Sequence, residues 1–251
     1  MELGRIGSDY GDFILSDLQI YDVAWTQADV TFDYNNPQHL VTDKSDSSIA
    51  LSNLKGYWHL SEGAGGIAYD SSGGGNNGTI NGATASLQQT TIPQLGLMDW
   101  AKSTPVSDEI TLIPNPGNLS KDIRNNNIRV RDNSLNLDGI GYGIVADNAS
   151  INPSEITLAV WVYYDNSIIG SGHANKGIIS KSGGAGSNRD YSLVLDSNSG
   201  PIFTLDSNKS CTFTSYTHDS TIANGWHYLA GTFNGTTRRI WLNGEEKGSA
   251  V

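Results

Sequence analysis

A glycine-rich turn near residue 75 carries the residues best suited to binding a metal ion. Asp70 offers a carboxylate, Asn77 offers an amide oxygen, and Gly78–Thr79 offers main-chain carbonyls on backbone that a ligand can approach closely. Hard cations such as Ca²⁺ prefer oxygen ligands of these kinds. The turn therefore predicts a calcium site, and the alternative is that Asp70 and Asn77 only shape the turn itself.

The acidic and histidine residues show none of the spacings that common catalytic sites require. Two carboxylates that act as acid and nucleophile must flank the same bond, whereas Glu245 and Glu246 are adjacent and point to opposite faces of a strand. The five histidines lack metal-binding spacing, and no nucleophile elbow or phosphate-binding loop is present. We expect no catalytic activity.

Aromatic residues beside Asn- and Asp-rich loops are candidates for stacking on sugar rings. Those we select are Trp100, Tyr164 and Tyr216. Aromatic side chains in strands more often pack in the core than bind ligands. That structural role is what we expect for three tryptophans: Trp58, Trp161 and Trp226.

Composition excludes several classes of partner. The chain has 251 residues with 26 acidic and 15 basic side chains, a net charge of −11. Binding to a phosphate backbone needs an excess of Lys and Arg, so we expect no nucleic-acid partner. No run is long enough to cross a membrane, and the first residues lack the apolar core of a signal peptide. A single cysteine, Cys211, excludes a disulfide framework within these residues.

Periodic apolar residues predict antiparallel strands. Residues 156–163 alternate, with one face formed by Ile156, Leu158, Val160 and Val162. Residues 12–21 also alternate, with Ile14, Ser16, Leu18 and Ile20 expected on one face and Phe13, Leu15, Asp17 and Gln19 on the other. Two Asn-Gly pairs predict tight hairpin turns: Asn234–Gly235 and Asn243–Gly244. These patterns predict an all-β fold, a two-sheet antiparallel sandwich.

Three stretches depart from this pattern. Thr26 to Val30 predicts one helical turn with Thr26 as its N-cap. Residues 34–55 are polar and poor in aromatic side chains, which predicts a linker or a surface-hugging connection. Residues 85–127 hold four of the seven prolines and lack a period, which predicts an insertion over the sandwich surface.

Four motifs together resemble laminin-G-like, concanavalin-A-like jelly rolls. WHYLAGTFNG at 226–235 and RIWLNGEE at 239–246 resemble the family's paired strands, W-H-x-x-A-G-T-[FY]-[DN]-G and [YW]-[LV]-N-G. LNLDG at 135–139 with ITLAVW at 156–161 resembles two further strands, and residues 56–79 resemble the family's opening. The resemblance covers about 56–84 and 134–251. It implies a jelly-roll sandwich for residues 56–251, and it places Asp17 beside the opening turn as a further calcium ligand.

The N-terminus resembles the end of such a domain. LGRIGS at 3–8 and FILSDLQIY at 13–21 are similar to the family's closing strands, whereas the sequence stops at 251 where that ending should follow. Residues 1–33 then finish a previous repeat, complete their own sandwich by permutation, or complete a neighbouring molecule. In each case the body needs this strand. We expect assembly through four apolar residues: Phe13, Leu15, Leu18 and Ile20.

The resemblance implies a structural or adhesion module of an extracellular or virion protein, such as a tail or surface appendage. Residues 92–100 are similar to segments of marine bacteriophage structural proteins. The expected partners are neighbouring copies or tandem repeats of the same domain. A carbohydrate-binding module that recognises a surface glycan is the alternative, and a polysaccharide-degrading enzyme of this fold is a second one.

Overall fold

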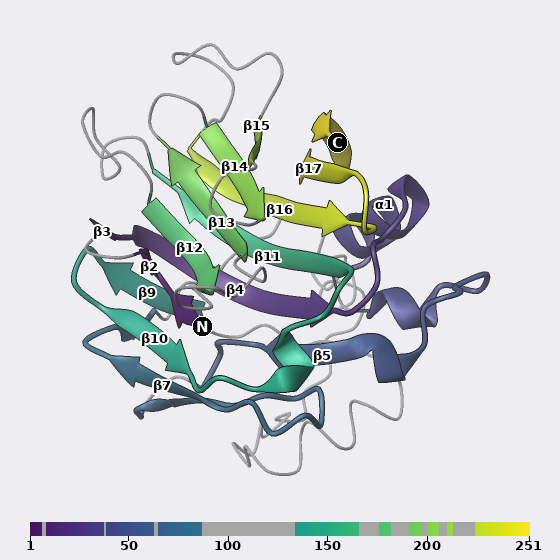
Figure 1. Ribbon diagram of the computed structural model, residues 1–251. Coiled ribbons are helices and arrows are strands. Elements are labelled where there is room, and N and C mark those ends of the chain that lie inside the picture. Colours follow the sequence, from purple (N-terminus) through teal and green to yellow (C-terminus); the bar gives the residue numbers. More distant parts are fainter. Residues whose placement is uncertain are drawn as a thin grey trace, which may run out of the picture.

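Two antiparallel β-sheets lie face to face in the computed structural model (Figure 1). The structure describes residues 1–6, 9–37, 39–62, 65–86, 134–165, 176–181, 191–196, 200–205, 210–212 and 224–251. Only the first two residues of the predicted insertion, 85 and 86, belong to this part. The arrangement confirms the predicted all-β, two-sheet jelly-roll sandwich.

Each sheet mixes strands from distant parts of the chain. Sheet 1 has the order β15 (Ser210–Thr212), β14 (Gly200–Leu205), β13 (Tyr191–Asp196), β12 (Lys176–Lys181), β1 (Glu2–Leu3), β10 (Tyr142–Val145), β7 (Gly78–Asn81) and β6 (Ile67–Ala68). Sheet 2 has the order β18 (Glu245–Ala250), β17 (Arg238–Leu242), β16 (Gly225–Phe233), β11 (Ile156–Tyr164), β4 (Asp12–Tyr21), β9 (Ser134–Asp138) and β8 (Thr84–Ser86). A further strand, β5 (Leu54–Trp58), also pairs with β4.

The remaining elements are short. β2 (Arg5–Ile6) and β3 (Asp9–Tyr10) form a small hairpin beside sheet 1. One α-helix is described, α1 (Gln27–Asn35), together with three single-turn 3₁₀ helices: η1 (Val41–Asp43), η2 (Leu51–Asn53) and η3 (Ala149–Ile151).

The main core fills the space between the two sheets. The alternation predicted for 156–163 is confirmed, because Ile156, Leu158, Val160 and Val162 all join this core. Trp58 also lies in it, fully buried. Burying apolar side chains of both inner faces is what stabilises a sandwich of this kind.

A second apolar cluster covers the outer face of sheet 2. Ala159 and Trp161 point out of β11 and pack beneath α1 and the segment that follows it. That segment, residues 36–53, is here called the strap; Gln38 is not described. The sequence predicts a linker or a surface-hugging connection for 34–55. Val41 and Ile49 are buried, so the strap is a packed layer.

The predicted hairpin turns are present. Asn243 and Gly244 between β17 and β18 have φ values of 51° and 82°, the left-handed backbone of a type I′ turn. Gly235 between β16 and β17 has φ 84°. Gly reaches this region at low cost, and Asn tolerates it better than most residues, which is why Gly235, Asn243 and Gly244 suit these turns.

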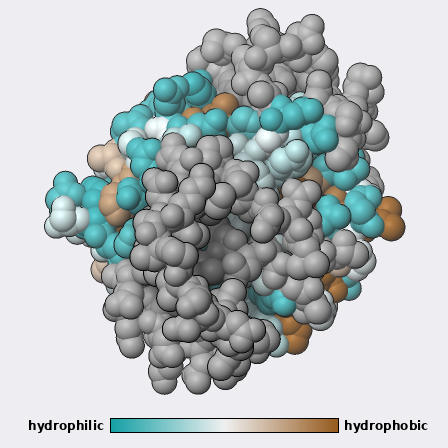
Figure 2. Space-filling view, turned by 180° about the vertical axis from the view of Figure 1, so that it is seen from behind, coloured by the Kyte–Doolittle hydropathy of each residue, from teal (hydrophilic) through white to brown (hydrophobic). Residues whose placement is uncertain are grey.

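Few large apolar side chains are exposed among the described residues. The view from behind shows separate brown patches within a mainly hydrophilic coloured surface (Figure 2). Apart from the last residue, the large apolar residues that are exposed are Leu51, Ile67, Tyr69, Ile140 and Ile144. Scattered exposed apolar residues of this kind are ordinary on a soluble surface.

Candidate assembly interface

The N-terminal ribbon, residues 1–21, places one strand in each sheet. Figure 1 shows β4 in purple between β11 and β9, while β1 lies between β10 and β12 of the other sheet. The four predicted assembly residues all lie in the main core: Phe13, Leu15, Leu18 and Ile20. In this single chain the ribbon inserts into its own body.

The ribbon also holds the rest of the sandwich together. Call β5–β10 the early half and β11–β18 the late half. Among the described strands, β10 pairs with β1 and β7, and β12 pairs with β1 and β13. In sheet 2, β11 reaches β9 and β5 only through β4. β1 in sheet 1 and β4 in sheet 2 therefore each lie at the boundary between the two halves, which we call the seam.

The hairpin after β1 fastens the ribbon to both halves. On the late half, Ser180 Oγ donates to Arg5 O at 2.7 Å and Lys176 Nζ donates to Tyr10 O at 2.7 Å. On the early half, the Arg5 guanidinium lies 3.8 Å from the ring centroid of Tyr142, a cation–π contact. Arg5 Nε also donates to Glu2 at 3.0 Å.

A β-bulge interrupts β4 at Asp17. Ser16 pairs with Trp161 and Gln19 with Ala159, so two ribbon residues oppose Val160 alone. Asp17 has φ 59°, in the left-handed region that Asp tolerates better than most residues. The strict alternation predicted for 12–21 is therefore wrong, because the extra residue shifts the phase of the strand.

The phase shift explains which ribbon residues face the core. Ahead of the bulge the core-facing residues are Phe13 and Leu15, whereas behind it they are Leu18 and Ile20. Ile14 and Ser16, which the alternation put on the face of Leu18, are buried outside the main core.

Polar side chains gather beneath α1, on the outer face of the bulge. Gln19 Nε2 lies 3.2 Å from Asp33 Oδ2 and 3.5 Å from Asp17 Oδ2. Tyr57 OH donates to Asp17 Oδ1 at 2.7 Å, and Tyr228 OH donates to Asp33 Oδ2 at 2.9 Å. Both carboxylates are buried. Buried polar groups with several partners specify one arrangement of the elements that carry them.

This network joins four elements, three from the first part of the chain and one, β16, from near its end. Asp17 and Gln19 come from β4, Asp33 from α1, Tyr57 from β5 and Tyr228 from β16. Sequence reasoning selected only Asp17 among them. Nothing in the spacing of the other four residues indicates that their strands meet, because it depends on the bulge and on where α1 lies.

The helix α1 begins at the predicted N-cap but is longer than the single turn expected. Thr26 Oγ1 lies 3.4 Å from the Asp29 main-chain nitrogen, and the Asp29 carboxylate accepts from Thr26 N at 3.0 Å. This reciprocal capping box satisfies free N–H groups at the start of the helix. At its end, Asn36 N donates to Phe32 O at 2.9 Å.

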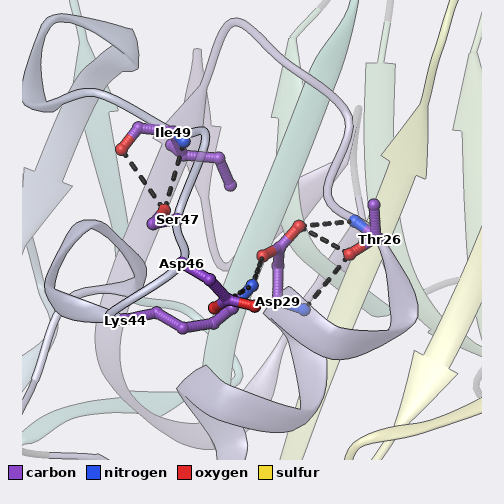
Figure 3. A network of polar contacts seen from close by, with 6 residues as sticks. All are labelled: Thr26, Asp29, Lys44, Asp46, Ser47 and Ile49. Carbon is purple, nitrogen blue, oxygen red and sulfur yellow. Dashed lines mark hydrogen bonds and ion pairs between the residues drawn. The ribbon is translucent and has the colours of Figure 1, made fainter.

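A partly buried ion pair fixes the strap to α1 (Figure 3). Lys44 Nζ lies 2.9 Å from Asp29 Oδ1 and 3.1 Å from Asp46 Oδ1. Burial alone would raise the pKa of Asp29, but hydrogen bonds from Lys44 and Thr26 outweigh it and bring that pKa below its ordinary value. The hydrogen bonds to Asp29 and Asp46 raise the pKa of Lys44.

The opening turn brings together three of the four predicted calcium ligands. Asp70 accepts from the main-chain nitrogens of Tyr57 at 3.0 Å and Asn76 at 2.8 Å, and Asp70 N donates to Asn77 Oδ1 at 2.9 Å. Gly78 follows directly and begins β7.

The fourth predicted ligand is held elsewhere. Asp17 bonds to the hydroxyl end of Tyr57, whereas Asp70 bonds to its main chain. The described residues contain no group of three or more His, Cys, Asp or Glu arranged to hold a metal ion. Calcium binding at this turn stays a prediction, which a rise in Tm on adding Ca²⁺, lost in Asp70→Asn, would check.

Of the predicted sugar-binding residues, Trp100 and Tyr216 lie outside the described residues. Tyr164 lies half-buried at the end of β11, against the main core, and burial raises the pKa of its hydroxyl. Nearby on the outer face of sheet 2, Tyr163 and Trp226 make an edge-to-face contact with ring centroids 5.7 Å apart. Trp226, expected in the core, is half-buried beside the second cluster.

Comparison with known proteins finds one family model that matches part of the chain. Residues 138–251 match the model of the concanavalin A-like lectin/glucanases superfamily. The matched part contains all of the late half and β10 of the early half. No curated protein and no solved structure gives a significant match. None of the described helices is long and apolar enough to cross a membrane.

Proposed function

We propose that the chain is a non-catalytic structural and adhesion module that joins neighbouring copies by exchanging the N-terminal ribbon. The observation that carries the proposal is the seam. One short segment supplies a strand to both sheets, and its partners lie in two halves that no other strand pairing joins among the described residues. A second copy can offer an identical ribbon to the same groove.

Strand addition of this kind uses interactions that are already present. Main-chain hydrogen bonds to β11, β9 and β5 give affinity, and apolar side chains of the ribbon fill the core. Because the exchanged contacts equal those within one chain, the balance between closed monomer and linked copies depends mainly on concentration and on the connection to α1. The location we propose, an extracellular or virion surface, rests on the sequence resemblance alone.

The decisive experiment mixes two different single-cysteine chains, both with Cys211→Ser. One carries Phe13→Cys and the other Leu137→Cys, residues that pair across β4 and β9. The mixture is unfolded in urea, refolded together and oxidised. A disulfide between the two chains can form only if a ribbon enters the body of the other molecule. We expect a cross-linked dimer whose yield rises with protein concentration.

A matched control replaces Leu137→Cys by Ile240→Cys. Ile240 is also buried in the main core, but β16 and β11 separate its strand β17 from β4. This mixture should give no specific cross-link. Equal yields in the two mixtures, or monomers only at every concentration, would refute assembly by exchange.

A carbohydrate-binding module is the second candidate. The matched superfamily includes lectins by name, and the half-buried Tyr163–Trp226 pair is an aromatic surface of the kind that stacks on sugar rings. Titration with a panel of surface polysaccharides should then change the tryptophan fluorescence, and Trp226→Ala should abolish the change. Absence of any response across the panel would leave the structural role alone.

A further inference from the structure

The core-facing residues of the ribbon are unevenly spaced. Phe13 and Leu15 are two residues apart, Leu15 and Leu18 are three apart, and Leu18 and Ile20 are two apart. An uninterrupted strand points alternate residues to one face, so it can offer only even spacings. The groove that receives the ribbon must therefore accommodate one extra ribbon residue between Leu15 and Leu18. We call this offset in the groove the step.

The step is built into the walls of the groove on both sides. On one side β11 opposes the two residues after Ser16 with Val160 alone. On the other side β9 pairs with the ribbon as far as Leu15, and β5 begins to pair at Leu18. The gap between β9 and β5 thus coincides with the bulge.

Polar groups of the body contact the residue at the step. Asp17 N donates to His59 O at 3.1 Å, and Asp17 Oδ1 accepts from Tyr57 OH at 2.7 Å. Two residues later, Gln19 reaches Asp33 of α1. A strand displaced by one residue would put Asp17 into the apolar core and Leu18 into these polar groups, and both changes are costly.

We infer that the groove selects its strand by register. The contacts that the groove makes with Asp17 determine which register is accepted. It fits a strand with two apolar pairs separated by a bulge that carries an acid, and it rejects a strand of regular alternation. The partner that matches is the ribbon of a second copy. Only this identification of the partner rests on the proposed function, because the step acts equally on the chain's own ribbon.

The first test uses the whole chain and needs no exchange. Two cysteine pairs, Leu15→Cys/Val162→Cys and Ile20→Cys/Leu158→Cys, report the pairing of β4 with β11 ahead of and behind the bulge. Each pair is placed in a Cys211→Ser chain that also carries Asp17→Gly or Asp17→Val. Gly reaches positive φ freely, whereas a β-branched residue does not.

We expect both disulfides to form in the parent and in Asp17→Gly, and one of the two to be lost in Asp17→Val. A residue that only adds stability would lower the unfolding midpoint without changing which pairs form. Both disulfides forming as efficiently in Asp17→Val as in the parent would overturn the inference. If Asp17→Val fails to fold whereas Asp17→Gly folds, the result would support a requirement for the bulge, because both substitutions remove the same carboxylate.

The second test addresses the choice of partner. The unmodified chain is refolded in the presence of excess fluorescent peptide covering residues 1–21, and incorporation is measured after size-exclusion chromatography. A second peptide lacks Asp17, which puts all four core-facing residues at alternate positions. A groove that recognises only apolar character would accept the second peptide at least as well. We expect it to be incorporated about tenfold less or worse, the ratio that about 1.4 kcal/mol produces.

The two tests fail in different ways. If neither peptide enters while the disulfide pattern is as expected, exchange is wrong and the selection of register within the chain stands. If the peptide without Asp17 enters as well as the complete one, the selection by register is wrong whereas exchange stands.

Discussion

The carboxylates of Asp17 and Asp33 lie beneath α1. Each carboxylate accepts a hydrogen bond from a tyrosine hydroxyl. The amide of Gln19 lies between them and so ties the bulge of β4 to α1. Removing one partner of a buried polar group costs more than the bond contributes, because the remaining group loses both its partner and water. At the residue scale, the hydroxyl of Tyr57 is therefore a sensitive position.

Tyr57→Phe should lower the free energy of unfolding by about 1–3 kcal/mol, because the carboxylate of Asp17 loses the shortest of its described hydrogen bonds. Urea denaturation at pH 7 measures the change. Tyr163→Phe removes a hydroxyl from a half-buried tyrosine on the same face of sheet 2 and should change the value by about 0.5 kcal/mol or less. Equal effects of the two substitutions would contradict a specific role for Tyr57.

The ion pair between Asp29 and Lys44 makes the attachment of the strap depend on pH. The pKa of Asp29 is lowered in the fold, so its contribution is present above the ordinary value of about 3.9 and is lost as the pH falls through the folded pKa. The pKa of Lys44 is raised, so its contribution is complete below about 10.4 and is lost as the pH rises through the folded pKa.

Lys44→Met should therefore destabilise the protein most at neutral pH, where it leaves the Asp29 carboxylate buried without its cation. The difference from the parent should shrink below about pH 4, as Asp29 becomes protonated. Urea midpoints measured from pH 2 to pH 8 test this. Lys55→Met is the matched control, because Lys55 pairs with Asp22 at a more exposed position. A difference that does not vary with pH would contradict the assignment.

At the scale of elements, the turn between β17 and β18 also holds α1 in place. Gln27 Nε2 donates to Gly244 O at 2.6 Å, and Thr31 Oγ1 lies 3.3 Å from the same oxygen. A Cβ on Gly244 would lie 2.8 Å from a ring carbon of Tyr34, so this glycine meets two requirements, a positive φ and close approach to the helix.

Gly244→Ala should destabilise the fold by about 1–3 kcal/mol through backbone strain, with an added cost from the contact with Tyr34. Gly235→Ala has nearly the same φ, and its nearest neighbour, Glu155 Oε1, is 4.0 Å away. The second substitution therefore measures strain alone. Thermal unfolding of both variants gives the comparison. A loss for Gly235→Ala that equals or exceeds the loss for Gly244→Ala would show that the contact with Tyr34 adds no cost.

The strands show where sequence patterns suffice and where they fail. Residues 156–163 follow strict alternation because β11 pairs along its whole length with β16. Residues 12–21 do not, because the bulge adds a residue at Asp17. No local pattern marks this bulge, since Ser-Asp within an apolar run also suits an ordinary strand. For the strap, the sequence left a linker and a surface-hugging connection both open, because few of its residues are apolar.

For the whole molecule, the ribbon is the seam of both sheets. The sequence resemblance predicted that a closing strand was needed, and the structure shows where it lies. What could not be predicted is that β1 and β4 both separate the early half from the late half. That property follows from the topology of two sheets at once, and no single motif contains it.

Leu18→Ala should destabilise the protein by about 2–5 kcal/mol and should also speed exchange between copies. The side chain of Leu18 holds only the ribbon in the core. Its removal therefore favours release of the ribbon from the seam. Leu229→Ala, in β16, removes an equally buried side chain from within the late half. It should cost a similar amount but leave the rate of cross-linking between Phe13→Cys and Leu137→Cys chains unchanged. Equal rates in both variants would argue against opening at the seam.

The position of β4 also has a consequence for biosynthesis. Its apolar residues leave the ribosome long before β11, the strand it pairs with along most of its length. At ~5–20 residues per second, the interval is roughly 7–30 s. During that time the edge of this ten-residue strand that pairs with β11 must stay uncovered in a crowded cell, even after β5 and β9 have been made. Other nascent chains on the same message expose the same segment, so synthesis itself brings ribbons and half-formed bodies of different molecules together.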